Sequence, residues 1–311
     1  MAATLALIKE LRELTGSGMS DCKKALEETA GDLKKAVEFL REKGLASAAK
    51  KASRIAAEGV VATVVTPDFS KAVVVEVNCE TDFVAINPDF KAYVEDIANQ
   101  LISSDTSSVD DFLNEAWAGD TAQSVGEVLK VKIATIGENL NIRRFVRFNK
   151  QQPGIISTYV HGGGKIGVIL EINCESQSEA VKDLGYNLCM QIAALFPKYL
   201  RREEVDQDFI EDERRILKAA AVQDPANANK PEQVIEKMVE GRLTKQLKET
   251  CLIEQEYVKD PSITVKQYVE NVAKEIGSEI NLVKFTCFEK GAGIEKKQED
   301  FAAEVSKVMQ G

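Results

Sequence analysis

Histidine is nearly absent from this chain of 311 residues, in which His161 is the only one. A Ser-His-Asp or Cys-His arrangement would have to use that imidazole, and a metal site with several histidine ligands is excluded. The six cysteines are scattered and form no CxxC motif. This spacing is typical of small buried thiols in a reducing compartment, and it argues against a zinc site.

Long apolar runs and an excess of positive charge are also missing. No stretch approaches the ~20 apolar residues that span a bilayer, so no membrane contact is expected. Lys9 to Glu13 interrupt the first apolar residues with charge, which predicts an amphipathic helix rather than a signal peptide. The formal charge of −10 would repel a phosphate backbone, and acidic residues surround most of the basic clusters. We therefore expect no direct nucleic acid partner.

The residues that are present predict a folded protein of two or three domains. Apolar residues make up 44% of the chain and charged residues 29%, which is typical of globular proteins. Residues 1–55 show apolar positions at helical spacing and predict three short helices. The third is expected to run from Leu33 to Lys43 and to end at Gly44, before a basic connector.

From Gly59 the apolar period changes to two, and β-branched residues dominate, which predicts strands. The strand pattern then recurs later in the chain. The aligned pairs are Gly59–Val65 with Gly154–Val160, Glu76–Glu80 with Glu171–Glu175, and Ile136–Phe145 with Ile276–Phe285. The offset grows from 95 residues in the first two pairs to 140 in the third, so one unit occurs twice and the second copy holds a net insertion of 45 residues.

Each copy runs strand, strand, helical segment, strand, which predicts an α+β fold with small antiparallel or mixed sheets. The insertion, at about residues 197–247, has the pattern of a helical hairpin, and residues 295–308 predict a final amphipathic helix. The predicted division has four parts. They are an N-terminal three-helix domain with its connector (1–55), core subdomain 1 (56–150), core subdomain 2 with the hairpin (151–288), and a C-terminal helical module (289–311).

Enzyme chemistry finds little support. Gly162-Gly163-Gly164-Lys165 resembles a phosphate loop, but Ile166 follows where the magnesium-binding hydroxyl should stand, and a strand follows where a helix should begin. The run is expected to be a hairpin turn, with His161 either solvent-exposed or in contact with a partner. No nucleophile motif accompanies that histidine, so we expect no catalytic residue, no metal and no cofactor.

The two copies differ directly after their shared strand. The first continues Thr81-Asp82-Phe83-Val84, here called the tip, whereas the second continues with the polar residues Ser176 to Glu179. An aromatic side chain beside an acid at a strand end is typical of an exposed anchor that fills a partner's pocket. The alternative is that Phe83 folds back as the first core residue of the next helix.

Several motifs, in order, resemble the elongation factor Ts family, the exchange factors for elongation factor Tu, over nearly the whole chain. They are Lys9–Arg12, Thr15–Met19, Asp21–Leu26, Asn78–Val84, Ile136–Asn139, Lys237–Arg242 and Gly293–Lys296. The resemblance implies a ubiquitin-associated type of N-terminal module, a two-subdomain core, an inserted hairpin and a C-terminal helix. It also implies a bacterial cytoplasmic protein, because the family's first helix begins almost at Met1 and leaves no room for a transit peptide.

The resemblance further implies how the tip works. Asp82 and Phe83, flanked by Thr81 and Val84, look like the residues that enter the partner's nucleotide domain and displace the elements holding magnesium, so that GDP leaves and GTP later releases the factor. The resemblance also implies partner contacts at Lys23, Ile136, Gly137, His161, Met238, Val239 and Phe301.

The partner is thus expected to be elongation factor Tu, through its GTPase domain and a further domain. Self-association through the hairpin is left open. The rival hypothesis is an adaptor or scaffold that binds partners without driving exchange, and a transferase, which would need the nucleophile motif and phosphate loop that the chain lacks, is the third.

Overall fold

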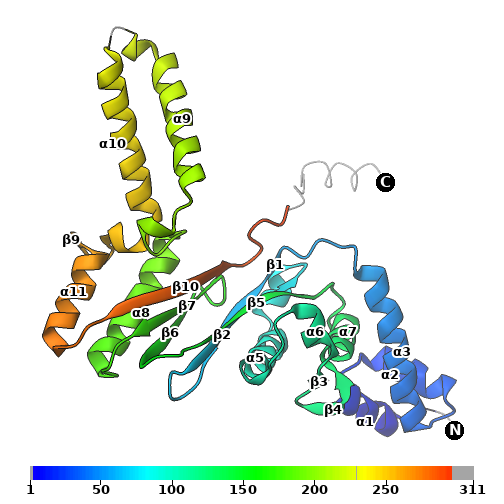
Figure 1. Cartoon of the computed structure of the whole chain (residues 1–311). Coiled ribbons are helices and arrows are strands. Elements are labelled where there is room, and N and C mark those ends of the chain that lie inside the picture. Colours follow the sequence, from blue (N-terminus) through cyan, green and yellow to red (C-terminus); the bar gives the residue numbers. More distant parts are fainter. Residues whose placement is uncertain (1–2, 229, 296–311) are drawn as a thin grey trace.

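Two three-stranded sheets form the centre of the structure, a computed structural model that describes residues 3–228 and 230–295 (Figure 1). The first sheet has the order β1-β2-β5, with β1 Glu58–Val65, β2 Lys71–Cys79 and β5 Asn141–Asn149. The second has the order β10-β7-β6, with β6 Gly154–His161, β7 Ile166–Asn173 and β10 Asn281–Glu289. Every pair in both sheets is antiparallel, so of the two sheet types that the sequence allowed, the structure has the antiparallel one.

The two sheets pack against each other through one face and against helices through the other. The residues buried between the sheets are Val61, Ala72, Val74, Phe148, Ile156, Ile169 and Phe288. On the outer face of the first sheet lies α5 Pro88–Ser103, and α8 Glu179–Leu195 covers the second. This alternation along each strand is the period of two that the sequence shows. The layers therefore run helix, sheet, sheet, helix, as expected for an α+β fold.

The predicted repeat is visible in the matching elements. Helix α7 Val125–Ile136 leads into β5, and α11 Val265–Ile276 leads into β10. Both helices begin with a capping box, and each is preceded by a two-stranded ribbon, β3 Ala116–Trp117 with β4 Asp120–Ser124 and β8 Glu256–Tyr257 with β9 Asp260–Thr264. Both units therefore build their third strand from the same local sequence signals.

Gly59 and Gly154 open the first strand of each copy for the same steric reason. Their φ angles are +142° and +152°. A Cβ atom would lie 2.2 Å from the carbonyl oxygen of Val77 at Gly59, and 2.0 Å from that of Ile172 at Gly154. Only glycine fits at either position.

Three N-terminal helices are present as predicted: α1 Leu5–Thr15, α2 Met19–Glu28 and α3 Leu33–Lys51. The expected end of the third helix at Gly44 is wrong, since α3 continues to Lys51. At Gly44 a Cβ atom would lie 3.4 Å from that of Ala134 in α7, so this glycine permits close helix packing rather than ending the helix.

The helical hairpin consists of α9 Gln207–Gln223 and α10 Glu232–Thr250. It projects from the second sheet, on the opposite side of the molecule from the N-terminal helices (Figure 1). The shorter helices are α4 Asp82–Ile86, α6 Val109–Asn114, η1 Arg202–Glu204, η2 Pro225–Asn227 and η3 Leu252–Glu254. The predicted C-terminal helix and Phe301 lie outside the described residues, and the four-part domain division stays a prediction. No helix in the described ranges is both long and apolar enough to cross a membrane.

Candidate functional site

The tip forms the start of α4, a single turn that follows β2 almost directly. Thr81 is the N-cap, and its Oγ1 accepts a hydrogen bond from the backbone N–H of Val84 at 3.4 Å. Phe83 is 78% exposed, so the alternative in which it folds back into the core is wrong. Val84 instead packs against the core of the first unit. Ile86, one turn after Phe83, is 67% exposed and lies on the same side of the helix. The turn therefore presents two apolar side chains to solvent.

The corresponding segment of the second copy has no such turn. After β7 ends at Asn173, the chain runs through a loop until α8 begins at Glu179. Ser178 occupies the position that corresponds to Phe83, and its side chain forms no cap hydrogen bond. The copies thus share their strands and differ at this surface, which supports a role for the tip other than folding.

One carboxylate from a distant part of the chain holds the tip. Glu138 Oε2 accepts hydrogen bonds from the backbone N–H groups of Glu80 and Thr81, each at 3.0 Å, and its Oε1 accepts one from Thr81 Oγ1 at 2.5 Å. Glu138 follows Ile136 and Gly137 at the end of α7. The structure therefore brings two of the predicted contact residues beside the tip.

Sequence reasoning missed Glu138 and Ile86. Glu138 lies inside the matching motif Ile136–Asn139, but nothing local shows that its carboxylate reaches a segment more than fifty residues earlier. For Ile86, the signal was its spacing of three from Phe83, which places both side chains on one face of a helix.

Cys79 supports the tip from inside. Its Sγ donates a hydrogen bond to the carbonyl oxygen of Thr81 at 3.1 Å. Burial raises the pKa of this thiol to about 12, so it stays protonated and remains a donor at neutral pH. Burial also keeps it away from solvent oxidants and metals, as the scattered cysteine spacing indicated.

A groove runs from the tip to the turn between β6 and β7. Its lining includes the tip residues Thr81 to Phe83 and the turn residues Gly162 to Lys165. The remaining residues on its walls include Arg54, Ile55, Glu58, Glu80, Ile86 and Lys290. Ile55 is 48% exposed, so an apolar side chain faces the groove from the segment after α3. The groove combines apolar and charged groups of both signs, which is suited to a protein surface rather than to a phosphate.

The glycine run in that turn docks the two units together. Gly162, Gly163 and Gly164 all have positive φ. The carbonyl oxygen of Gly164 accepts a hydrogen bond from the N–H of Val61 at 2.8 Å, and a Cβ at this glycine would lie 2.7 Å from a methyl of Val60. The run is therefore a hairpin turn, as predicted, and it packs on β1.

His161, just before that turn, is exposed. Its Nδ1 lies 2.9 Å from the hydroxyl of Tyr159, whose ring packs edge-on against Tyr186 at 5.4 Å between centroids. The imidazole is thus held at the surface by Tyr159, which is itself packed against Tyr186. His161 is adjacent in sequence to the groove but is not among its lining residues.

The remaining predicted contacts lie elsewhere. Lys23 is exposed on α2, 3.8 Å from the carboxylate of Glu27. Met238 is half-buried on the projecting hairpin, but Val239 beside it is only 2% exposed. The side chain of Val239 therefore packs within the hairpin, and Met238 is the more accessible of the two.

No group of three or more His, Cys, Asp or Glu side chains in residues 3–228 and 230–295 is arranged to hold a metal ion. What the site offers is an anchored apolar and acidic projection beside a mixed groove.

Comparison with known proteins gives one consistent match. Residues 80–292 match the family model described as elongation factor TS. A protein named elongation factor Ts from Clostridium novyi is 50% identical over 306 residues, with 98% of each chain covered. The protein of that name from Clostridium tetani is 48% identical over 307 residues, with 99% of each covered, and one from Clostridium botulinum strain Alaska E43 is 50% identical over 302 residues, with 97% covered.

Proposed function

Because the chain belongs to the elongation factor Ts family, it is a nucleotide exchange factor for elongation factor Tu, and we propose that its tip drives the exchange. In this proposal Asp82 and Phe83, framed by Thr81 and Val84, enter the nucleotide domain of the partner next to its magnesium site. As an elongation factor of translation, the protein acts in the cytoplasm, and it makes or breaks no covalent bond.

The observation that carries the proposal is an exposed aromatic side chain on a firmly held turn. Leaving Phe83 78% exposed gains nothing for folding, yet the turn below it is fixed by the bonds to Glu138 and by Cys79. Backbone that hydrogen bonds already hold in place loses little further conformational entropy when a partner buries the side chain that it carries. The tip therefore has the properties of a preorganised anchor.

The physical consequence for the partner is a weaker hold on its nucleotide. Magnesium bridges phosphate oxygens and neutralises their charge, so displacing its protein ligands weakens GDP binding. Linkage then requires the factor and the nucleotide to reduce each other's affinity by the same ratio. GDP departs faster from the complex, and the complex persists until GTP binds and releases the factor.

Further contacts extend the proposal over both ends of the molecule. Ile136 and Gly137 adjoin the tip through Glu138 and are proposed to touch the same GTPase domain, as is Lys23 on the N-terminal helices. His161 and Met238 belong to the second sheet and the hairpin, and are proposed to reach that domain or a further domain. Val239 would support Met238 from within the hairpin, and Phe301 is retained as a proposed contact.

The hairpin carries the one proposal of self-association. Ile216, Val222 and Val234 expose apolar side chains on α9 and α10, with exposed fractions of 53%, 59% and 41%. Exposed aliphatic side chains on a projecting hairpin are suited to pairing with a second copy. Sedimentation equilibrium of the wild type and of Ile216→Ser/Val222→Ser tests this, since a wild type that stays monomeric at high concentration would exclude it.

The experiment that tests the tip is the release of fluorescent GDP from elongation factor Tu. The wild type is compared with Asp82→Ala/Phe83→Ala and with Ser178→Ala, a control at the matching position of the second copy. We expect acceleration by the wild type and by the control, and almost none by the tip variant. Equal acceleration by all three would refute the role of the tip. Stable binding to elongation factor Tu without any acceleration by the wild type would instead favour the adaptor.

A further inference from the structure

Glu76 is a fully buried carboxylate on the face between the two sheets. It follows Ala72 and Val74 in the alternation along β2, and those two residues pack against the second sheet. Its exposed fraction is 0%. The same strand ends at Cys79, and only Glu80 separates it from the tip. A charge at such a position would be costly unless its oxygens were fully paired.

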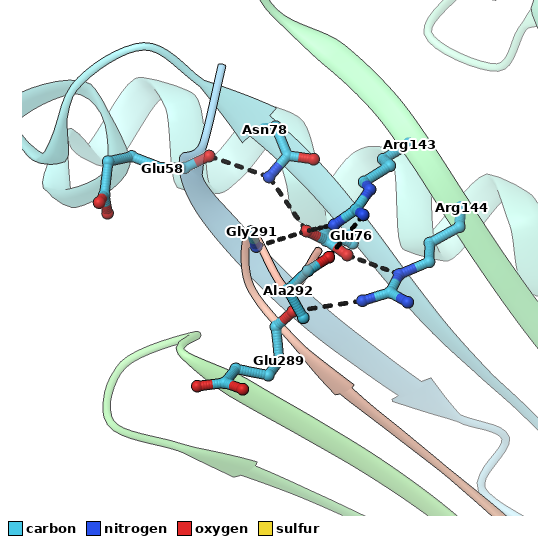
Figure 2. Close-up of polar contacts among 8 residues, drawn as sticks. All are labelled: Glu58, Glu76, Asn78, Arg143, Arg144, Glu289, Gly291 and Ala292. Atoms are coloured by element: carbon cyan, nitrogen blue, oxygen red, sulfur yellow. Dashed lines mark hydrogen bonds and ion pairs between the residues drawn. The ribbon is translucent and has the colours of Figure 1, made fainter. Parts of the chain in front are cut away.

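The oxygens of Glu76 are paired with groups from three parts of the chain (Figure 2). Oε1 accepts hydrogen bonds from Asn78 Nδ2 at 3.0 Å, from Arg143 Nη1 at 3.0 Å and from the backbone N–H of Gly291 at 2.7 Å. Oε2 accepts one from Arg144 Nε at 2.6 Å. These bonds outweigh the effect of burial, and the pKa of Glu76 is lowered, so the carboxylate is charged at neutral pH.

The same two arginines hold the chain that leaves the second sheet. Arg143 Nη2 donates to the carbonyl oxygen of Ala292 at 2.6 Å, and Arg144 Nη2 donates to that of Glu289 at 3.2 Å (Figure 2). Glu76, Arg143, Arg144 and the backbone of residues 289–292 are here called the Glu76 clamp. It ties the end of β10, in the second unit, to β2 and β5 in the first.

Around the clamp, the interface between the sheets is nearly symmetric. The guanidinium of Arg144 lies over the ring of Phe288 at 4.2 Å, and Lys284 Nζ lies over the ring of Phe148 at 4.4 Å. The repeat offset of 140 relates Arg144 to Lys284 and Phe148 to Phe288. Each unit therefore contributes a cation, arginine in one and lysine in the other, and a phenylalanine ring at matching repeat positions, as in a two-fold dimer.

Only the first unit has a complete clamp. Glu171, the counterpart of Glu76, is 5% exposed and has Lys284 Nζ at 3.4 Å, yet its Oε2 forms no hydrogen bond. Val283 stands where a second arginine would be needed, at the position matching Arg143. The clamp is thus an asymmetric addition to an interface that the repeat would otherwise make symmetric.

We propose that the Glu76 clamp is a positioning device, which fixes the second unit in one orientation relative to the tip. The apolar contacts between the sheets come from aliphatic side chains and two phenylalanines, and hydrophobic attraction depends little on direction. The charged hydrogen bonds of the clamp are directional and are satisfied in one arrangement only. The clamp also continues into the groove, because the N–H of Lys290 donates to the carbonyl oxygen of Lys165 at 2.9 Å.

The functional part of this inference rests on the proposed function. A partner that binds the tip and the second unit at the same time needs these two surfaces of the factor to lie at a fixed separation. If the clamp is lost, the second unit samples several orientations, and only a fraction of the molecules can make both contacts. The apparent affinity for the partner then falls to that fraction of its full value, while the tip itself is unchanged.

The first test uses the free protein and is independent of any partner. Spin labels are attached through non-canonical amino acids at Ala92 on α5 and Asn271 on α11, both exposed positions, and the distance distribution is measured. We expect Glu76→Gln to widen the distribution at least about twofold and Glu171→Gln, the matched control, to leave it unchanged. If the width of the distance distribution is unchanged in Glu76→Gln, or increases equally in both variants, the positioning role of the clamp is refuted.

A second variant protects the test against misfolding of Glu76→Gln. Arg143→Lys keeps the charge, but a lysine cannot bond Glu76 and the Ala292 carbonyl in the same way as the guanidinium fork. It is expected to widen the distribution as well, and its failure to do so would count against the clamp.

The second test is GDP release from elongation factor Tu. Glu76→Gln should raise the half-saturating factor concentration about tenfold and leave the maximal rate within about twofold, a split that lower stability alone would not produce. A wider distribution with an unchanged half-saturating concentration would reject the positioning role in exchange. Absence of acceleration by the wild type would reject the proposed function and leave the distance result standing.

Discussion

Replacing Glu138 by alanine is expected to weaken the action of the tip although it changes none of the tip's own residues. The carboxylate accepts three hydrogen bonds from Glu80 and Thr81. Bonds to a charged acceptor contribute about 1.5 to 3 kcal/mol each when they are buried, and because Glu138 is half-buried we assign about 1 kcal/mol to each. The tip would then lose about 3 kcal/mol of local stabilisation.

This loss has a defined kinetic consequence. If the tip is ordered in only a fraction of the molecules, the apparent affinity falls to that fraction of its full value, so 3 kcal/mol corresponds to at most about a 150-fold rise in the half-saturating concentration. The maximal rate of GDP release should not change, because Asp82 and Phe83 are still present. The assay is stopped-flow release of fluorescent GDP over a range of factor concentrations.

Glu138→Gln is the matched control for this prediction. Its single amide oxygen can still accept both backbone N–H groups that Oε2 binds in the wild type, so the half-saturating concentration should rise less than about tenfold. If Glu138→Ala leaves that concentration unchanged, or lowers the maximal rate instead, the anchoring role of the carboxylate is refuted.

Three further predictions concern exposure, steric fit and pH. Ile86→Ala should leave the unfolding free energy within about 0.5 kcal/mol of the wild type, because the side chain is 67% exposed. It should raise the factor concentration that half-saturates GDP release by about tenfold, and an unchanged concentration would show that Ile86 is not part of the contact surface. Gly59→Ala should lower the unfolding free energy by more than about 2 kcal/mol in guanidinium titrations, since the new Cβ would lie 2.2 Å from the Val77 oxygen; a wild-type midpoint would contradict the steric argument. Because the pKa of Glu76 is lowered in the folded protein, its ionised carboxylate stabilises the fold at pH values above 4.5, the ordinary pKa of glutamate, and this contribution is lost as the pH falls through the folded-state pKa. When the pH is lowered from about 5, the unfolding free energy of the wild type should therefore fall more than that of Glu76→Gln. Parallel curves of unfolding free energy against pH would refute this.

The repeat and its strands were predictable because their signals are local. A period of two with β-branched residues marks β1, β2, β6 and β7, and an offset that grows from 95 to 140 places the insertion. The capping boxes at Ser124 and Thr264 are local signals as well.

What could not be predicted depends on contacts between distant segments. Gly44 looks like a helix end in sequence, and only the proximity of Ala134 explains why the helix continues. The burial of Val239 and the reach of Glu138 to the tip are likewise set by tertiary packing. The sequence showed that Phe83 is not needed by the repeated unit, but its exposure became visible only in the structure.

The central claim is that the tip drives nucleotide release and does not merely help binding. The most direct measurement is the rate of GDP release from elongation factor Tu at a concentration of Asp82→Ala/Phe83→Ala that saturates the complex, with saturation established by calorimetry. The account predicts that the fully formed complex releases GDP almost as slowly as elongation factor Tu alone. Release at the wild-type maximal rate from that complex would contradict it.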